Sequence, residues 1–171
     1  LLFLSRADQG RQEIQKERVN LSELTEMAAL EMELLAEKEN IRLEMQIEEN
    51  LFAEVDESLY IRMVVNLVSN AIAYHGGPGY VKIRLQGMKN QILGSIEDDG
   101  KGISPEDLPH IWERFYRVDK ARIQDSHSGL GLPMVKWIVQ AHQGEIQVES
   151  TLGKGSVFTF WLPTEESGEK K

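Results

Sequence analysis

Two asparagines are the first residues in this chain whose type and spacing could do chemistry. Asn66 and Asn70 are four residues apart in a segment with helical apolar spacing, so both amides should lie one turn apart on one face. Asparagine is a mediocre helix former, so the pair has a cost that a function would explain. An amide oxygen is also a hard ligand that suits Mg²⁺. Two asparagines taken alone can equally face water.

Two adjacent acids followed by glycines form a second group. Asp98 and Asp99 end an apolar run and precede Gly100 and Gly102. Glycine lets a backbone pass close to a neighbouring group. A solvated turn is the alternative interpretation.

A glycine-rich stretch opens a later helical segment. In Ser128-Gly129-Leu130-Gly131-Leu132, the free N–H groups and dipole of a helix start would favour a phosphate. Met134 stands where a GxGxxG motif needs its third glycine, and no GxxxxGK[ST] motif occurs, so neither a Rossmann site nor a P-loop is indicated. Asp125-Ser126-His127 is interpreted as loop polarity, because sequence neighbours rarely form a catalytic triad.

Composition limits the class of protein that carries these groups. The chain has 171 residues, of which 41% are hydrophobic and 27% charged, which suits one globular domain. No apolar run reaches membrane length, and a net charge of −9 argues against nucleic-acid binding. The absence of cysteine rules out disulfides and thiolate metal sites, and cytoplasmic localisation is the expectation.

The elements that would position these groups alternate between helices and strands. A capping box at Asn20 predicts a helix to about Asn40, and a strand over 41–49 should pair with 51–56. Helices over 56–74 and 130–142, hairpins over 81–99 and 144–163, and a helix start at Ser104-Pro105 are also predicted. The fold class is α/β, a two-layer sandwich with helices on one face of a mixed, mainly antiparallel sheet. The first helix should direct toward the core Leu24, Met27, Ala28, Leu34 and Leu35, and the 56–74 helix Ile61, Val64, Val65, Val68, Ala71 and Ile72.

Five motifs, in their order and spacing, resemble the catalytic ATP-binding domain of sensor histidine kinases in the GHKL superfamily. NLVSNAIAYH (66–75) resembles the N box, EDDGKGI (97–103) and SGLGLPMVKWIV (128–139) the two glycine boxes, ERFYRVDKAR (113–122) the F box and GKGSVFTFWLP (153–163) the closing hairpin. The resemblance implies the Bergerat fold. It also implies a preceding dimerisation and phosphoacceptor helix ending over 1–17, the catalytic domain over 18–163 and a disordered tail over 164–171.

The same resemblance implies ATP and magnesium as cofactors and assigns roles to residues. Asp98 would accept a hydrogen bond from the adenine amino group, and Asn70 would coordinate magnesium. Asn66 and Arg117 would act catalytically at the phosphate end. Residues 104–128 would form a lid over ATP, with Phe115 and Tyr116 anchoring it on apolar surface. The remaining nucleotide-binding residues would be Tyr74, Gly100, Gly102, Ile103, Arg114, Ser128, Gly129, Leu130, Gly131 and Leu132.

Phosphoryl transfer to a histidine is the activity that the resemblance implies. Hydrolysing members of the superfamily carry a glutamate where this chain has Asn66, and an amide cannot deprotonate water. The histidines 75, 110, 127 and 142 lack the context of an acceptor, so the acceptor is expected on an upstream domain. The implied partners are that domain and a response regulator, and the parent protein is expected in the plasma membrane.

Three departures from the family pattern keep alternatives open. Ala73 stands where lysine or arginine is common, His127 where an extra glycine is frequent and Pro133 where alanine is usual. Loss of a cation at position 73 removes a phosphate contact. A non-catalytic GHKL module with weak nucleotide binding is therefore the first alternative, and a hydrolysing GHKL ATPase is the second.

Overall fold

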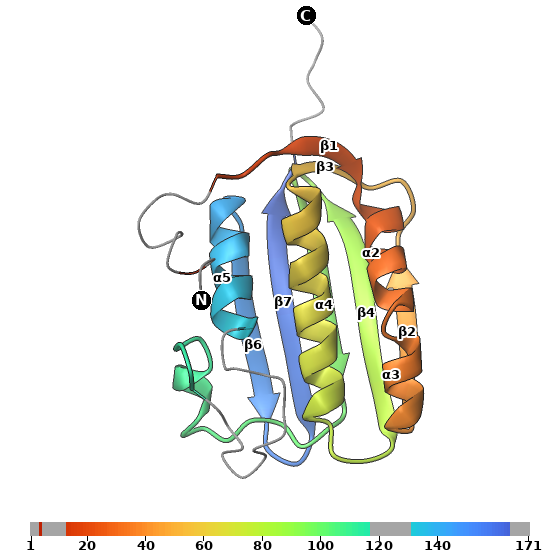
Figure 1. The fold of residues 1–171 in the computed structure, drawn as a ribbon, viewed down its shortest axis with the longest axis vertical. Helices are drawn as coiled ribbons and strands as arrows, with labels where there is room; N and C mark the ends of the chain where they lie inside the picture. Colours follow the sequence, from red (N-terminus) through yellow and green to blue (C-terminus); the bar gives the residue numbers. More distant parts are fainter. Residues whose placement is uncertain (1–3, 5–12, 117–130, 165–171) are drawn as a thin grey trace, which may run out of the picture.

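The computed structural model describes residues 4, 13–116 and 131–164. Their helices and strands pack as two layers (Figure 1). The chain order is β1 (Glu17–Asn20), α2 (Leu21–Leu30), α3 (Glu33–Lys38), β2 (Ile41–Ile47), β3 (Phe52–Val55), α4 (Glu57–Ala73), β4 (Gly79–Met88), β5 (Gln91–Asp98), the 3-10 helix η1 (Leu108–His110), α5 (Gly131–Ala141), β6 (Glu145–Thr151) and β7 (Gly155–Pro163).

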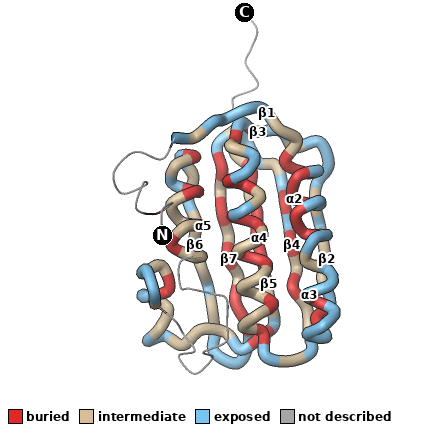
Figure 2. Tube along the Cα trace, in the orientation of Figure 1, coloured by how far each residue is buried: buried red, intermediate tan, exposed pale blue. Residues whose placement is uncertain are grey.

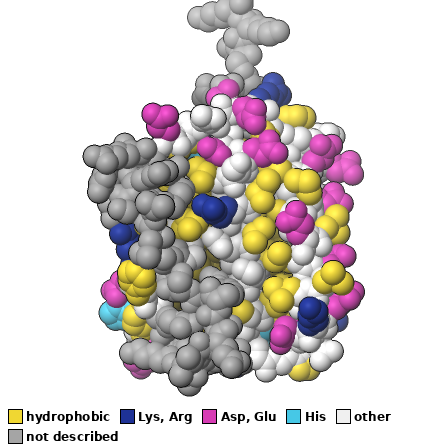
Figure 3. All heavy atoms as spheres, viewed as in Figure 1, with side chains coloured by type: hydrophobic (Ala, Val, Ile, Leu, Met, Phe, Trp, Pro, Cys, Tyr) yellow, Lys and Arg dark blue, Asp and Glu magenta, His cyan; other side chains and the backbone are white. Residues whose placement is uncertain are grey.

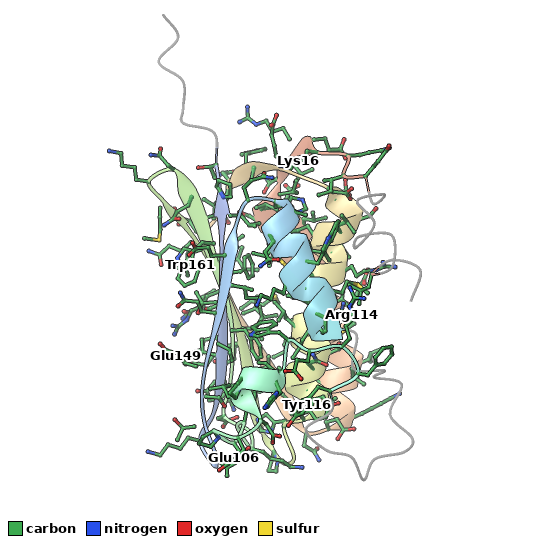
Figure 4. The ribbon with its side chains drawn as sticks, turned by 90° about the vertical axis from the view of Figure 1, so that its left-hand side faces the viewer. Lys16, Glu106, Arg114, Tyr116, Glu149 and Trp161 are labelled. Carbon is green, nitrogen blue, oxygen red and sulfur yellow. The ribbon has the colours of Figure 1, made fainter. Side chains whose placement is uncertain are left out.

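A five-stranded sheet forms one layer. Its strand order is β2-β4-β5-β7-β6, in which only the β2–β4 pair is parallel. Helices α2, α3, α4 and α5 cover one face of this sheet, as the two perpendicular views show (Figures 1 and 4). The predicted two-layer sandwich with a mainly antiparallel sheet is therefore confirmed.

The predicted pairing of strand 41–49 with 51–56 is wrong. β2 pairs with β4, whereas β3 pairs with β1 in a separate two-stranded sheet. The turn between β2 and β3 is held against the start of α2, because Leu21 N–H donates to Leu51 O (2.7 Å) and Leu51 N–H donates to Ser22 Oγ (3.0 Å). β1 was missed because its four residues contain Val19 as their only aliphatic side chain and show no apolar alternation.

The first helical region is two helices instead of one. Asn20 caps it as predicted, since its side chain accepts a hydrogen bond from Glu23 N–H (3.2 Å), and Asn40 ends it with a φ of 56°. The helix breaks after Leu30. Burial in α2 follows the stripe of Leu21, Leu24, Thr25, Ala28 and Ala29, and α3 buries only Ala36.

The predicted core positions Met27, Leu34 and Leu35 are consequently wrong. Their exposed fractions are 47%, 72% and 40%, because Met27 lies off the buried stripe and the break shifts the buried face of α3. Figure 3 shows apolar and acidic side chains side by side over this part of the surface.

The core lies between α4 and the inner face of the sheet (Figure 2). Alternate residues of the central strands point at the helices, as the two-residue period of a strand requires. On α4, Val64, Val68 and Ile72 are buried as predicted, but Ile61, Val65 and Ala71 are only half-buried. The strands contribute the buried residues Val81, Ile83, Leu85, Ile92, Ile96, Phe158, Phe160 and Leu162.

The segment after β5 contains a turn where a helix was predicted at Ser104-Pro105, and that prediction is wrong. Ser104 Oγ donates to Asp107 Oδ2 (2.9 Å) and accepts from Asp107 N–H (3.2 Å), so the side chain closes a turn. Only the three-residue η1 follows. No helix in the described part of the chain is long and apolar enough to span a membrane.

The anchor of this segment also differs from the prediction. Phe115 is 58% exposed, so it does not anchor the segment, and Tyr116 instead donates its hydroxyl hydrogen bond to Asp107. Ile111 is buried and Trp112 packs edge-on against Phe158, at 5.9 Å between ring centroids. Trp112, which lies three residues before Phe115 and four before Tyr116, therefore makes the apolar contact.

The predicted domain boundaries fall largely outside the described residues. Leu4 is helical and buried, residues 13–16 are not helical, and β1 begins at Glu17. At the other end, Thr164 is the last residue described. The predicted helix tail is therefore wrong over residues 13–17, and its part before residue 13 and the disordered tail after Thr164 remain predictions.

Candidate functional site

The asparagines of α4 face the beginning of α5. A Cβ atom placed on Gly131 would lie 3.9 Å from Asn66 Oδ1 and 3.9 Å from Asn70 Nδ2. Asn66 Nδ2 also donates to Met134 Sδ at 3.8 Å. The structure thus brings together two predicted groups, the amide pair and the N-terminal turn of a helix. Such a turn has free N–H groups that favour anions.

The position of the amides is fixed by the rest of α4. Asp56 caps the helix by accepting a hydrogen bond from Leu59 N–H (3.1 Å), and the opposite face of the helix is buried in the core. Asn66 and Asn70 are half-buried, so their amides lie at the border between packed protein and solvent. A ligand would therefore meet a preorganised pair of amides on a rigid element.

Asp98 is the last residue of the central strand β5 and lies opposite Ser156 of β7. Its Oδ1 accepts a hydrogen bond from Gly100 N–H at 2.9 Å. Burial raises the pKa of Asp98, and the hydrogen bond from Gly100 only partly offsets this. The carboxyl group is thus a half-buried acceptor with a defined orientation, as recognition of a polar ligand edge requires.

Gly100 and Gly102 are both required by close contacts within the protein. A Cβ on Gly100 would lie 2.8 Å from the Cα of His75, and one on Gly102 would lie 2.2 Å from Thr151 O. Gly102 also has a φ of 69°, a conformation that favours glycine. The turn 99–103 is therefore pressed between the end of α4 and the loop joining β6 to β7. Contact of these glycines with a base remains a prediction.

Other predicted site residues surround these two groups. Tyr74 follows the last residue of α4, and its N–H donates to Asn70 O (3.1 Å). Ile103 and Leu132 are half-buried against the core, and Ala73 is the last residue of α4. Arg114 is exposed in the turn after η1 (Figure 4).

Four predicted site residues lie outside the described part of the chain: Arg117, Ser128, Gly129 and Leu130. The cluster Asp125-Ser126-His127 also lies outside it. Arg114 lies two residues after Trp112. The Trp112 ring centroid is 5.5 Å from Lys136 Nζ of α5, so the segment that carries Arg114 lies beside α5. The beginning of the predicted lid is therefore attached beside α5.

His75 and Asp99 form a contact that sequence reasoning missed. His75 is 4% exposed, and its Nε2 is 2.6 Å from Asp99 Oδ1. The same oxygen accepts a hydrogen bond from Tyr80 N–H at 2.8 Å. Burial alone would raise the pKa of Asp99, but these hydrogen bonds outweigh it and hold the pKa below its ordinary value. The two residues are 24 positions apart, and no sequence pattern signals their pairing.

The donor set fits a nucleotide better than a metal held by protein alone. Among the residues described, no group of three or more His, Asp or Glu side chains could hold a metal ion. Asn70 offers one hard oxygen, so a magnesium ion there would take most of its ligands from phosphates and water, as is usual for this ion.

Comparisons with known proteins agree with this geometry. Residues 55–166 match the HATPase_c family, which is described as histidine kinase-, DNA gyrase B-, and HSP90-like ATPase. Sensor histidine kinase YclK of Bacillus subtilis is 36% identical over 148 residues, which are 85% of this chain and 31% of that protein. The chain therefore spans about a third of this relative's length.

Solved structures resemble the chain over most of its length. The nucleotide-free catalytic domain of histidine kinase ThkA has 28% identity and a TM-score of 0.75, and the match covers 88% of this chain and 96% of that one. ThkA in complex with the response regulator protein TrrA has 26% identity and a TM-score of 0.75, covering 99% of this chain and 48% of that one.

Proposed function

This chain belongs to the family of histidine kinase-, DNA gyrase B- and HSP90-like ATPases, and we propose that it binds Mg-ATP beside α4, α5 and the end of β5. It is the catalytic ATP-binding domain of a sensor histidine kinase. It would then donate the terminal phosphoryl group to a histidine outside this chain. The two-layer sandwich is the Bergerat fold of the GHKL superfamily.

The meeting of the α4 amides with the first turn of α5 is the observation that carries this proposal. The space beside Gly131 where a Cβ would stand is 3.9 Å from both amides, so a phosphate chain at the helix start would contact both of them. Asp98 ends the strand that runs alongside α4, and its carboxyl group would accept from the adenine amino group. Phosphate and base recognition would then be assigned to separate elements.

Protein groups in phosphoryl transfer mainly position the nucleotide and neutralise its charge. Asn70 would hold magnesium, which supplies charge neutralisation at the phosphates. Asn66 and Arg117 would orient the terminal phosphate, with Arg114, Ser128, Gly129, Leu130, Gly131 and Leu132 around it and Tyr74, Gly100, Gly102 and Ile103 near the base. An amide at position 66 cannot take a proton from water, which favours transfer over hydrolysis.

The proposed partners follow from the same assignment. The chain would act on the dimerisation and phosphoacceptor domain of its parent protein, and the phosphoryl group would pass to a response regulator. The complex of ThkA with TrrA supports the second partner, because 99% of this chain matches the structure of ThkA in that complex. We place the domain in the cytoplasm, where ATP is available, and its parent in the plasma membrane.

Weak nucleotide binding by a non-catalytic module is the second candidate, and Ala73 favours it. The last residue of α4 lies three positions after Asn70 and offers no cation to a phosphate. Calorimetric titration with ATP, in the presence and absence of magnesium, separates the two candidates. We expect saturable binding that magnesium strengthens. In Asn70→Ala the gain from magnesium should disappear, whereas Ser69→Ala, one position earlier on α4, should retain it. Absence of saturable binding in the wild type would contradict the proposal.

A further inference from the structure

We propose that His75 is a positioning residue, which holds the turn that orients Asp98 and thereby sets the preference for a purine with an exocyclic amino group. The inference rests on the proposed nucleotide function, because it assigns Asp98 to the base.

His75 joins three elements through one carboxylate oxygen. It lies just beyond the end of α4, where 4% of its surface is exposed. Its Nε2 is 2.6 Å from Asp99 Oδ1, and that oxygen also accepts from Tyr80 N–H (2.8 Å). Tyr80 is the second residue of β4 and Asp99 directly follows β5. The side chain of Asp99 thus links the end of α4 to the adjacent ends of two central strands.

The backbone of His75 makes a second contact with the same turn. Lys101 N–H donates to His75 O at 3.2 Å, so the residues on both sides of Gly100 are bonded to His75. Gly100 itself approaches His75 so closely that a Cβ would lie 2.8 Å from its Cα. The position of Gly100 is therefore determined by His75.

Gly100 transmits this position to Asp98. Its N–H donates to Asp98 Oδ1 at 2.9 Å, and this hydrogen bond orients the carboxyl group. The Ser156 backbone also donates to this carboxyl group, so a shift of the turn would remove one of its two backbone donors and leave Asp98 less firmly oriented. Base recognition depends on the direction of a hydrogen bond, so such a loss of orientation would weaken binding of an amino group more than binding of phosphates.

The other half of the turn is held independently of the His75 side chain. Gly153 N–H donates to Lys101 O (2.7 Å), and Ile103 N–H donates to Ser150 Oγ (2.7 Å). Removing the His75 side chain should therefore release Asp99 and loosen the adjacent residues 98 and 100, while the backbone bond of Lys101 to His75 O and the bonds to the β6–β7 loop hold the rest of the turn.

The unpaired nitrogen of His75 argues against a role in packing alone. Nδ1 is buried and has no hydrogen-bond partner within the part of the chain that the structure describes. Such an atom is destabilising, so an apolar ring of similar size would serve better if stability were the only demand. Nε2, which contacts Asp99, is the atom that gives this histidine a function.

Calorimetric titration with ATP and with purine riboside triphosphate, which lacks the amino group, tests the proposal. His75→Phe should weaken ATP binding about tenfold, the equivalent of one lost hydrogen bond to a charged group. Binding of purine riboside triphosphate should change less than about twofold, because Asp98 has no amino group to bind there. His75→Gln, which offers an amide N–H to Asp99, should recover most of the ATP affinity. Asp99→Ala should reproduce the selective loss and covers the case in which His75→Phe fails to fold.

His142→Phe is the matched control, because it removes a second buried histidine, which lies just after the C-terminal end of α5. It should lower the thermal unfolding midpoint and leave the ratio of the two affinities unchanged. Equal losses for both nucleotides in His75→Phe and Asp99→Ala, or no loss for either, would overturn the inference. Wild-type protein that binds neither nucleotide would instead contradict the proposed function.

Discussion

Asp56 N–H donates a hydrogen bond to the Nε2 atom of buried His142 at 3.0 Å, and this contact ties the C-terminal end of α5 to the cap of α4. The Nδ1 atom of His142 donates to Ile138 O at 2.7 Å, so both ring nitrogens are used by the neutral imidazole. The two helices that carry the candidate phosphate site are therefore joined at one end by a single uncharged histidine.

This contact predicts a pH dependence of stability. Burial lowers the pKa of His142 below its ordinary value of 6.5. The folded protein therefore binds fewer protons than the unfolded chain, and the contribution of His142 is complete above pH 6.5 and is lost as the pH falls below it. We expect the thermal unfolding midpoint to decrease between about pH 7.5 and about pH 5.5. His142→Gln should show a smaller decrease, and equal decreases in both proteins would contradict the assignment.

Replacement of Asp98 by asparagine should weaken ATP binding by about 1–3 kcal/mol, because a charged acceptor becomes an amide that must present its oxygen correctly. Isothermal titration calorimetry of the variant with Mg-ATP measures the loss. Glu97→Gln removes a charge from the preceding residue, which points to the other face of the strand, and should bind as the wild type does. An unchanged affinity in Asp98→Asn would remove this residue from the site.

Addition of a lysine at position 73 should restore a phosphate contact. Ala73 lies three residues after Asn70 on α4, so Ala73→Lys should strengthen ATP binding by about 1.5 kcal/mol, roughly tenfold, through a charge-assisted hydrogen bond. ADP should gain less and adenosine nothing, and added salt should reduce the gain. Gln140→Lys adds the same charge at the exposed end of α5 and serves as the control. Equal gains for all three ligands would show that position 73 does not face phosphates.

Three glycine substitutions, each in a different loop, separate backbone strain from steric contact. Gly77→Ala should be neutral, because a Cβ there meets no atom within 4 Å and its φ is not left-handed. Gly153→Ala has open space but a φ of 83°, so it should cost about 1–2 kcal/mol of unfolding free energy. Gly102→Ala adds a 2.2 Å contact with Thr151 O to a φ of 69° and should cost clearly more. Urea unfolding measures the series, and equal costs for Gly102 and Gly153 would contradict it.

Local patterns predicted the elements that have a strong period or a clear terminus. The α4 helix, its asparagine face and the β4–β5 and β6–β7 hairpins are confirmed, because caps, glycines and apolar spacing are all local signals. The partner of β2 was mispredicted because strand pairing is a long-range property: β3 follows β2 after a short turn, yet β4 provides the pairing edge.

The candidate site was predictable only in part, for the same reason. The motifs predicted Asn66, Asn70 and Asp98 as members of one site, and in the structure the two asparagines lie close to Gly131. The pairing of His75 with Asp99 depends on how the end of α4 passes over the turn after β5, which no spacing in the sequence specifies. Met27 and Leu34 were wrongly assigned to the core, because apolar character alone does not tell which side of a broken helix is buried.

Transfer of label from γ-labelled ATP most directly tests whether this chain is a kinase domain that acts on a histidine elsewhere. The chain is incubated with Mg-ATP, alone and together with the separately produced phosphoacceptor domain of its parent protein. The account predicts no acid-labile label on this chain and slow labelling of a histidine on the added domain, since the tether that raises the effective concentration is missing. Stoichiometric labelling of this chain by itself, or steady phosphate release without any labelled acceptor, would contradict the account.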